Sequence, residues 1–162
     1  MSDFSSYDND PVPFCYVCPR FSYINEAMRR QEEERQKALA QYRYLSRNLT
    51  PFDAIPVPPK IKIMASNFPT PIDITHDKDR TILIELSRIA LAQFNADQVE
   101  KYQFNELVKA TTRHIPHGTY YITFNATLPS NSSATTTFQA HVWDRRPLLK
   151  ESPVVESCSI KT

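Results

Sequence analysis

The stretch ELVKATTRHIPHGTYYITFNAT, residues 106–127, combines a clear two-residue period with the single glycine of the chain, Gly118. Apolar and polar side chains alternate in TYYITFNAT, which is typical of a β-strand with one buried face, and ELVKATTRHI is also rich in strand-forming residues. Gly118 lies between the two runs, where a turn needs a residue with positive φ, and only glycine adopts that conformation without steric cost. The stretch therefore predicts a β-hairpin that turns at HIPHG.

The two-residue period continues beyond this hairpin. The run TTTFQAHVWD, residues 135–144, places Phe138, Ala140 and Val142 at alternate positions, and PVVESCSI, residues 153–160, supplies a last strand. The polar stretch LPSNSSA separates the second and third strands and has the chemistry of a hairpin connection.

An amphipathic helix is predicted before the strands, in RTILIELSRIALAQFNADQ, residues 80–98. Asp77 and Asp79 suit its N-terminal turn, where carboxylates meet the positive end of the helix dipole. Two short β-prone pieces, KIKIMA (residues 60–65) and PIDIT (residues 71–75), lie upstream. The predicted apolar face of the helix consists of Ile82, Leu86, Ile89, Ala90 and Phe94.

One helix followed by consecutive strands predicts an α+β fold, with one central helix packed on an antiparallel meander sheet of four to five strands. Tyr121 and Trp143 fall out of the buried alternation, so we expect them on an open face of the sheet as a candidate contact surface. A base-stacking platform for single-stranded nucleic acid is the alternative for these aromatics. The formal net charge of +1 does not favour nucleic acid as a partner.

Composition divides the chain into four regions. Residues 1–22 are polar and predicted to be a disordered lead, residues 23–47 a charged and solvated helical extension, residues 48–59 a proline-rich linker, and residues 60–162 the folded domain. No apolar run is long enough for a membrane-spanning helix, and the first residues do not resemble a secretory signal. We therefore expect a soluble protein of the cytoplasm or nucleus, without membrane contact.

The N-terminal helix carries opposite charges four residues apart, such as Glu26 with Arg30 and Glu33 with Lys37. These pairs allow the helix to form while it stays solvated. Its sparse apolar positions leave two roles open, a docking helix for a partner or a solvated extension.

The cysteines and histidines do not form a recognisable reactive site. Cys15 and Cys18 form a C-x-x-C pair, but the nearest histidine is His76, and the pair does not follow a predicted strand. His114 and His117 lie three residues apart in the hairpin turn without a third nearby ligand. One glycine cannot make a phosphate-binding loop. We expect no enzymatic activity, no metal and no cofactor.

The residues LSRIALAQFN, with Leu86, Ala90 and Asn95 at their spacing, resemble the helix signature of the cystatins, especially those of plants. The strands ELVKATTRHIPHGTYYITFNAT and FQAHVWDRRP resemble the next three strands of that family, within the cystatin–monellin superfamily. The resemblance covers about residues 80–147. It implies a cystatin-like domain that binds papain-like cysteine proteases with a wedge of loops and obstructs their active-site cleft.

The cystatin wedge consists of an N-terminal glycine, a first hairpin reading Gln-x-Val-x-Gly and a second hairpin bearing Pro-Trp. Here only the glycine of the first hairpin matches, no glycine precedes the helix, and leucine follows Pro147. The substituted loops are richer in positive charge than the family motif, which favours an acidic partner surface. The candidate partner-binding residues are His114, Ile115, Pro116, His117 and Gly118 in the first loop and Trp143, Asp144, Arg145, Arg146 and Pro147 in the second.

The sequence therefore predicts a protein-binding domain whose inhibition of papain-like cysteine proteases is weak or lost. The alternative is a non-inhibitory structural or regulatory protein that recruits partners through its N-terminal helix.

Overall fold

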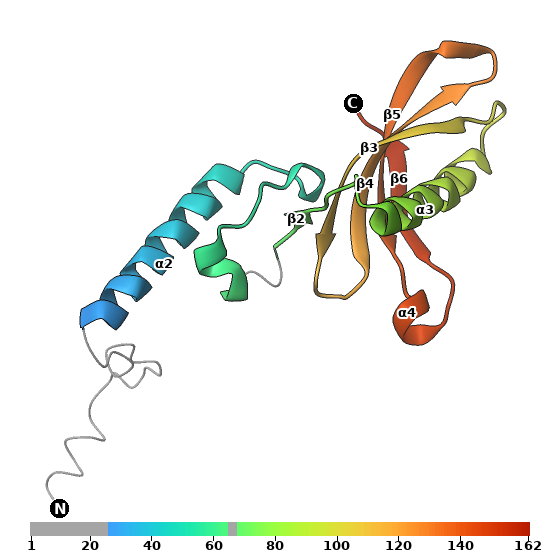
Figure 1. The fold of residues 1–162 in the computed structure, drawn as a ribbon. Helices are drawn as coiled ribbons and strands as arrows, with labels where there is room; N and C mark the ends of the chain where they lie inside the picture. Colours follow the sequence, from blue (N-terminus) through green and yellow to red (C-terminus); the bar gives the residue numbers. More distant parts are fainter. Residues whose placement is uncertain (1–25, 65–67) are drawn as a thin grey trace, which may run out of the picture. The chain divides into compact units, whose positions relative to one another are not determined.

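The computed structural model describes residues 26–64 and 68–162 (Figure 1). The chain divides into two units, Met1–Gln41 and Tyr42–Thr162. The predicted lead, with Cys15 and Cys18, lies outside the described residues. No helix in the described ranges is long and apolar enough to cross a membrane.

The predicted N-terminal helix is confirmed as α2 (Glu26–Ser46). Arg30 lies 3.8 Å from the Glu26 carboxylate, as the sequence predicts, whereas Glu33 pairs with Arg29 and not with Lys37. Because these side chains are exposed, each ion pair contributes little to stability.

A five-stranded antiparallel sheet and one helix form the body of the second unit, which confirms the predicted α+β fold (Figure 1). The strands pair in chain order, so each lies beside the strand that precedes it. They are β2 (Thr70–Pro71), β3 (Gln103–Arg113), β4 (Thr119–Leu128), β5 (Asn131–Trp143) and β6 (Val154–Ile160). The four long strands lie where the sequence predicts them.

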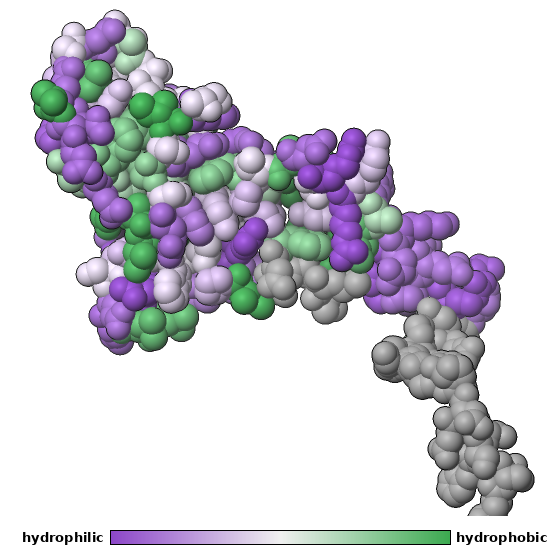
Figure 2. All heavy atoms as spheres, turned by 180° about the vertical axis from the view of Figure 1, so that it is seen from behind, coloured by the Kyte–Doolittle hydropathy of each residue, from purple (hydrophilic) through white to green (hydrophobic). Residues whose placement is uncertain are grey.

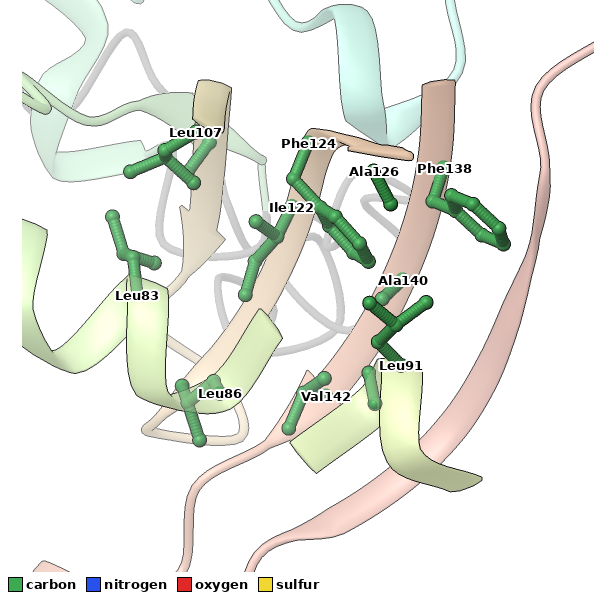
Figure 3. Packing of buried hydrophobic residues seen from close by; sticks show 12 residues of the cluster. Leu83, Leu86, Leu91, Leu107, Ile122, Phe124, Ala126, Phe138, Ala140 and Val142 are labelled. Atoms are coloured by element: carbon green, nitrogen blue, oxygen red, sulfur yellow. The ribbon is translucent and has the colours of Figure 1, made fainter. Parts of the chain in front are cut away.

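The core forms where the alternating apolar positions of β4 and β5 meet across the register. Phe124 pairs with Phe138, and their rings stack with centroids 5.5 Å apart, while Ile122 pairs with Ala140 (Figure 3). All four side chains are fully buried. A shift of one residue would turn this apolar set to the other face, so the pattern itself fixes the pairing.

The helix α3 (Asp77–Asn95) lies across this apolar face, with Asp77 and Asp79 in its first turn as predicted (Figure 1). Its buried stripe is rotated from the predicted one toward Leu83 and Leu91, while Ile82, Ile89 and Phe94 are only partly buried. Ser87 belongs to the stripe because its hydroxyl donates to the Leu83 carbonyl at 2.7 Å. This internal hydrogen bond allows a polar residue in the core, which the apolar pattern could not indicate.

The two short upstream strands are largely wrong predictions. Residues of KIKIMA belong to a 3₁₀ helix (Pro59–Met64), because the prolines before them fix φ near the value of a helical turn. In PIDIT only Pro71 lies in a strand, although the Ile72 amide still donates to the Ala110 carbonyl. Asp73 then accepts hydrogen bonds from Thr75 and ends the extended conformation.

The second face of the sheet is not fully open, which corrects the expectation for Tyr121. A 3₁₀ turn from the proline-rich region, Pro51–Asp53, lies against this face, and the ring of Phe52 meets Tyr121 edge-on at 5.4 Å. The Thr111 hydroxyl donates to the Pro51 carbonyl at 2.6 Å, and Lys109 forms an ion pair with Asp53. Tyr121 is therefore only 6% exposed, so it cannot offer a contact surface.

We predict that Phe52→Ala destabilises the folded protein, because it removes the ring that covers Tyr121. Phe52 is itself partly buried, so the expected loss in the free energy of unfolding is about 1–2 kcal/mol. Urea denaturation followed by circular dichroism measures the change. Asn48→Ala, at an exposed position just before the turn, is the control, and equal stability of the two variants would contradict a packing role for the Pro51–Asp53 turn.

Candidate functional site

The structure brings the two predicted partner-binding loops to the same end of the sheet (Figure 1). The β3–β4 loop spans residues 114–118, between the paired residues Arg113 and Thr119. Thr119 also pairs with Trp143, the last residue of β5, so the second loop starts beside the end of the first. We call the exposed parts of these loops, residues 114–117 and 147–149, the loop-end surface.

Gly118 joins the two loops, and its turn role is confirmed by a φ of +87°. A Cβ atom built on it would lie 2.4 Å from the carbonyl oxygen of Asp144. The Asp144 amide donates to the Gly118 carbonyl at 2.8 Å, and the indole of Trp143 donates to the His117 carbonyl at 3.1 Å. Glycine is therefore needed twice, for the turn and for the close approach of the second loop.

Two threonines at the adjoining ends of β3 and β4 stabilise the first loop by hydrogen bonds. The Thr119 hydroxyl donates to the Pro116 carbonyl, and the Thr112 hydroxyl donates to the Thr119 carbonyl, both at 2.8 Å. Pro116 follows a cis peptide bond. The loop residues themselves are exposed, namely His114, Ile115, Pro116 and His117, and Ile115 is 57% exposed.

The second loop contains the short helix α4 (Arg146–Leu149), which is anchored by Arg146. The Nε and Nη2 atoms of Arg146 donate to the two carboxylate oxygens of Asp144 at 2.8 and 3.0 Å, and its Nη1 atom pairs with Glu85 of α3. The Arg146 guanidinium holds the pKa of Asp144 below its usual range. The next side chains, Leu148 and Leu149, point to solvent and are 60% and 51% exposed.

The predicted cationic character of this end is largely neutralised within the chain. Arg146 pairs with Asp144 and Glu85, and Arg145 lies 2.8 Å from Glu151. Among the described residues, Arg113 forms no ion pair, and its buried Nε atom lacks a hydrogen-bond partner. What the loop tips present is therefore mainly apolar, and Figure 2 shows hydrophobic side chains at this lower end, interrupted by polar ones.

The histidines occupy different surroundings. His114 and His117 lie in the exposed loop, whereas His141 of β5 stacks on Tyr121, with ring centroids 4.4 Å apart. Burial lowers the pKa of His141, so its imidazole is neutral at pH 7. Among the described residues, no group of three or more His, Cys, Asp or Glu side chains is arranged to hold a metal ion.

The thiol of Cys158, on β6, is not activated. The residue packs beside the core, and burial raises its thiol pKa to about 11. Because the thiolate is the reactive form, this cysteine is a poor nucleophile near neutral pH.

Sequence reasoning missed two parts of this region. It did not pair Arg146 with Asp144 and Glu85. It also did not bring Glu156 together with Arg113 and His141, which line one small cavity in the structure. The adjacent residues Asp144, Arg145 and Arg146 are a sequence signal for the ion pair between Arg146 and Asp144. No local signal exists for the second, because the cavity joins residues from four different strands.

Comparison with known protein families, with curated proteins and with solved structures finds no match.

We predict that Gly118→Ala destabilises the protein by at least about 2 kcal/mol, because a methyl group is strained at this φ and overlaps the Asp144 carbonyl. Urea denaturation measures the loss. The control is Ser130→Ala, in the exposed turn at the opposite end of β4, which should change stability by less than about 0.5 kcal/mol. Similar small effects of both substitutions would show that the two loops are not held in contact.

We further predict that Asp144→Asn lowers the free energy of unfolding at pH 7 by about 1–3 kcal/mol, because it removes the charge that Arg146 binds. The pKa of Asp144 is lowered in the folded state from an unfolded value near 3.8. Its contribution is therefore fully present above that value and is lost as the pH falls through the folded pKa.

The check is urea denaturation of wild type and Asp144→Asn at pH 7 and at steps below pH 4, with exposed Asp97→Asn as the control. The gap between wild type and Asp144→Asn should close in acid. A gap that is constant with pH would mean that the charged carboxylate is not what stabilises the loop.

Proposed function

We propose that this chain is a protein-binding domain that engages its partner through the loop-end surface. The observation that supports this most directly is the contact between Gly118 and Asp144, which holds two loops side by side at one end of the sheet. Ile115, Leu148 and Leu149 project from these loops as exposed apolar side chains. Apolar side chains on a fixed frame are suited to fill pockets on a partner without a large loss of conformational entropy.

Binding fits the chemistry of this region better than catalysis. The Cys158 thiol is partly buried and protonated at neutral pH. The Trp143 indole and the Arg145 and Arg146 side chains are occupied by contacts within the chain. A nucleophile with an adjacent general base is the usual requirement for covalent catalysis. Among the described residues, the loop-end surface presents no such pair.

A papain-like cysteine protease is the target class that the cystatin resemblance suggests, with the loops obstructing the active-site cleft. The order of one helix and four long strands, with both loops at one end, supports this proposal. The loops depart from the cystatin motif at most positions, and Leu148 stands where the family has tryptophan. We expect inhibition in the micromolar range, since the loss of such contacts removes binding energy concentrated in a few residues.

The second candidate is recruitment of a partner by α2, which is supported by its length of 21 residues and its largely exposed side chains. A chain that starts at Tyr42 separates the two proposals. Binding that survives this truncation favours the loop-end surface, whereas binding that disappears from a folded truncated chain favours α2.

The proposed function is tested by titrating the full chain against papain with a fluorogenic substrate, alongside Ile115→Glu and Leu148→Glu. Both positions are more than half exposed, so the substitutions should leave the fold intact. A charge in an apolar contact should weaken inhibition by about tenfold or more in each variant. Val99→Glu, at a fully exposed position beyond the C-terminal end of α3, is the matched control and should inhibit like wild type.

Absence of inhibition by folded protein at tens of micromolar would reject papain-like proteases as the target. Inhibition that is unchanged in Ile115→Glu and Leu148→Glu would reject the loop-end surface as the binding surface.

A further inference from the structure

A small cavity of about 140 Å³ lies next to the first loop, on the face of the sheet away from α3. Its lining comes from the ends of the four long strands and from the loop itself, and includes Arg113, Pro116, Tyr121, His141, Trp143 and Glu156. We call it the Arg113 pocket. The Pro51–Asp53 turn does not line it, so this part of the second face stays accessible.

The Arg113 guanidinium has no carboxylate partner among the described residues. The guanidinium of Arg113 lies over the Tyr121 ring, 5.4 Å from its centroid, and its Nε atom is buried without a hydrogen-bond acceptor among the described residues. A buried donor that is left unsatisfied costs free energy, so the interactions of the Arg113 guanidinium are not completed by the chain itself. The other arginines of this end, Arg145 and Arg146, are already paired with carboxylates.

The other lining residues of the pocket are aromatic side chains and one glutamate. His141 and Trp143 supply aromatic surfaces, whereas the buried Tyr121 ring lies behind them against Arg113 and His141. The Trp143 indole N–H is already donated to the His117 carbonyl. His141 has no partner for its ring nitrogens among the contacts of the described residues. Glu156, an exposed lining residue, adds one negative charge, which opposes a doubly charged anion such as phosphate more than a singly charged one.

We propose that the Arg113 pocket receives the carboxylate of an aspartate or glutamate side chain of the protein that docks on the loop-end surface. The proposal rests on the function proposed above and adds the chemistry of the partner. A carboxylate fits the volume, and its two oxygens match the fork of a guanidinium, which forms the strongest type of protein hydrogen-bonded ion pair. Pro116 and Trp143 belong to this pocket and to the two loops, so one partner can fill the pocket while it covers the loop tips.

Glu156 is a competitor within the chain, because it lines the same cavity as Arg113. Glu156→Gln removes a negative charge that competes with an external carboxylate for Arg113, so the binding of that carboxylate should strengthen. The effect of Glu156→Gln on ligand affinity therefore measures how strongly Glu156 competes for the pocket.

The test uses the methylamide of N-acetylglutamic acid as the probe and the matching glutamine compound as its uncharged counterpart. Trp143 is the single tryptophan of the chain, so its indole N–H gives one reporter signal in a proton–nitrogen NMR spectrum of the full chain. We expect saturable movement of this signal with the glutamate probe and none with the glutamine probe.

Variants identify the residue that binds the probe. Arg113→Gln should weaken probe binding by about tenfold or more, Arg113→Lys should weaken it less, and Glu156→Gln should strengthen it severalfold. Arg88→Gln is the matched control, because Arg88 also lies over an aromatic ring, that of Phe104, but on the α3 side. The dispersion of the spectrum verifies that each variant is folded.

Equal responses to the glutamate and glutamine probes, or unchanged probe binding in folded Arg113→Gln, would overturn the proposal that the Arg113 pocket binds a carboxylate. The outcome of the papain titration does not depend on this result, so the two proposals can be rejected separately. Probe binding through Arg113 without any effect of Ile115→Glu or Leu148→Glu on a partner would keep the pocket and reject the loop-end surface. Loss of partner binding in the loop variants without probe binding would reject the pocket alone.

Discussion

Burial of β4 on both faces is the constraint on which the rest of the domain depends. Ile122 and Phe124 point toward α3, whereas Tyr121 on the other face lies beneath Phe52. A central strand that is covered twice cannot slide in its register, since either face would lose its packing. The register of β3 and β5 follows from that of β4, and so does the position of the loops at the strand ends.

The fixed register explains why the two loops meet. Thr119 starts β4 and pairs with the last residue of β5, so the residues on either side, Gly118 and Asp144, come into backbone contact. Any side chain at residue 118 would separate them, because its Cβ would overlap the Asp144 carbonyl. The single glycine of the chain thus connects sheet packing to the geometry of the proposed binding surface, and a surface assembled before binding loses less entropy when a partner arrives.

The fold could be predicted from the sequence because its signals are local. The period of two in β3 to β6, the amphipathic stretch of α3 and the need for positive φ at Gly118 are all readable within a few residues. Contacts between distant residues could not be predicted in this way, such as Phe52 with Tyr121 or Arg146 with Glu85. Both corrections to the site have this origin, since the first contact buries an aromatic expected on the surface and the second neutralises an arginine expected to be free.

Neutralisation within the chain also changes what the site can recognise. An end with several unpaired arginines would attract any acidic surface, and that attraction would be long-ranged and weak in specificity. Arg145 and Arg146 instead stabilise their own loop, and Arg113 remains in a pocket with aromatic walls. A charge held in a confined pocket is less screened by salt than one on an open surface. In the proposed role, Arg113 would distinguish partners by the position of a carboxylate relative to the apolar loop tips. Recognition at this end would therefore depend on geometry more than on net charge.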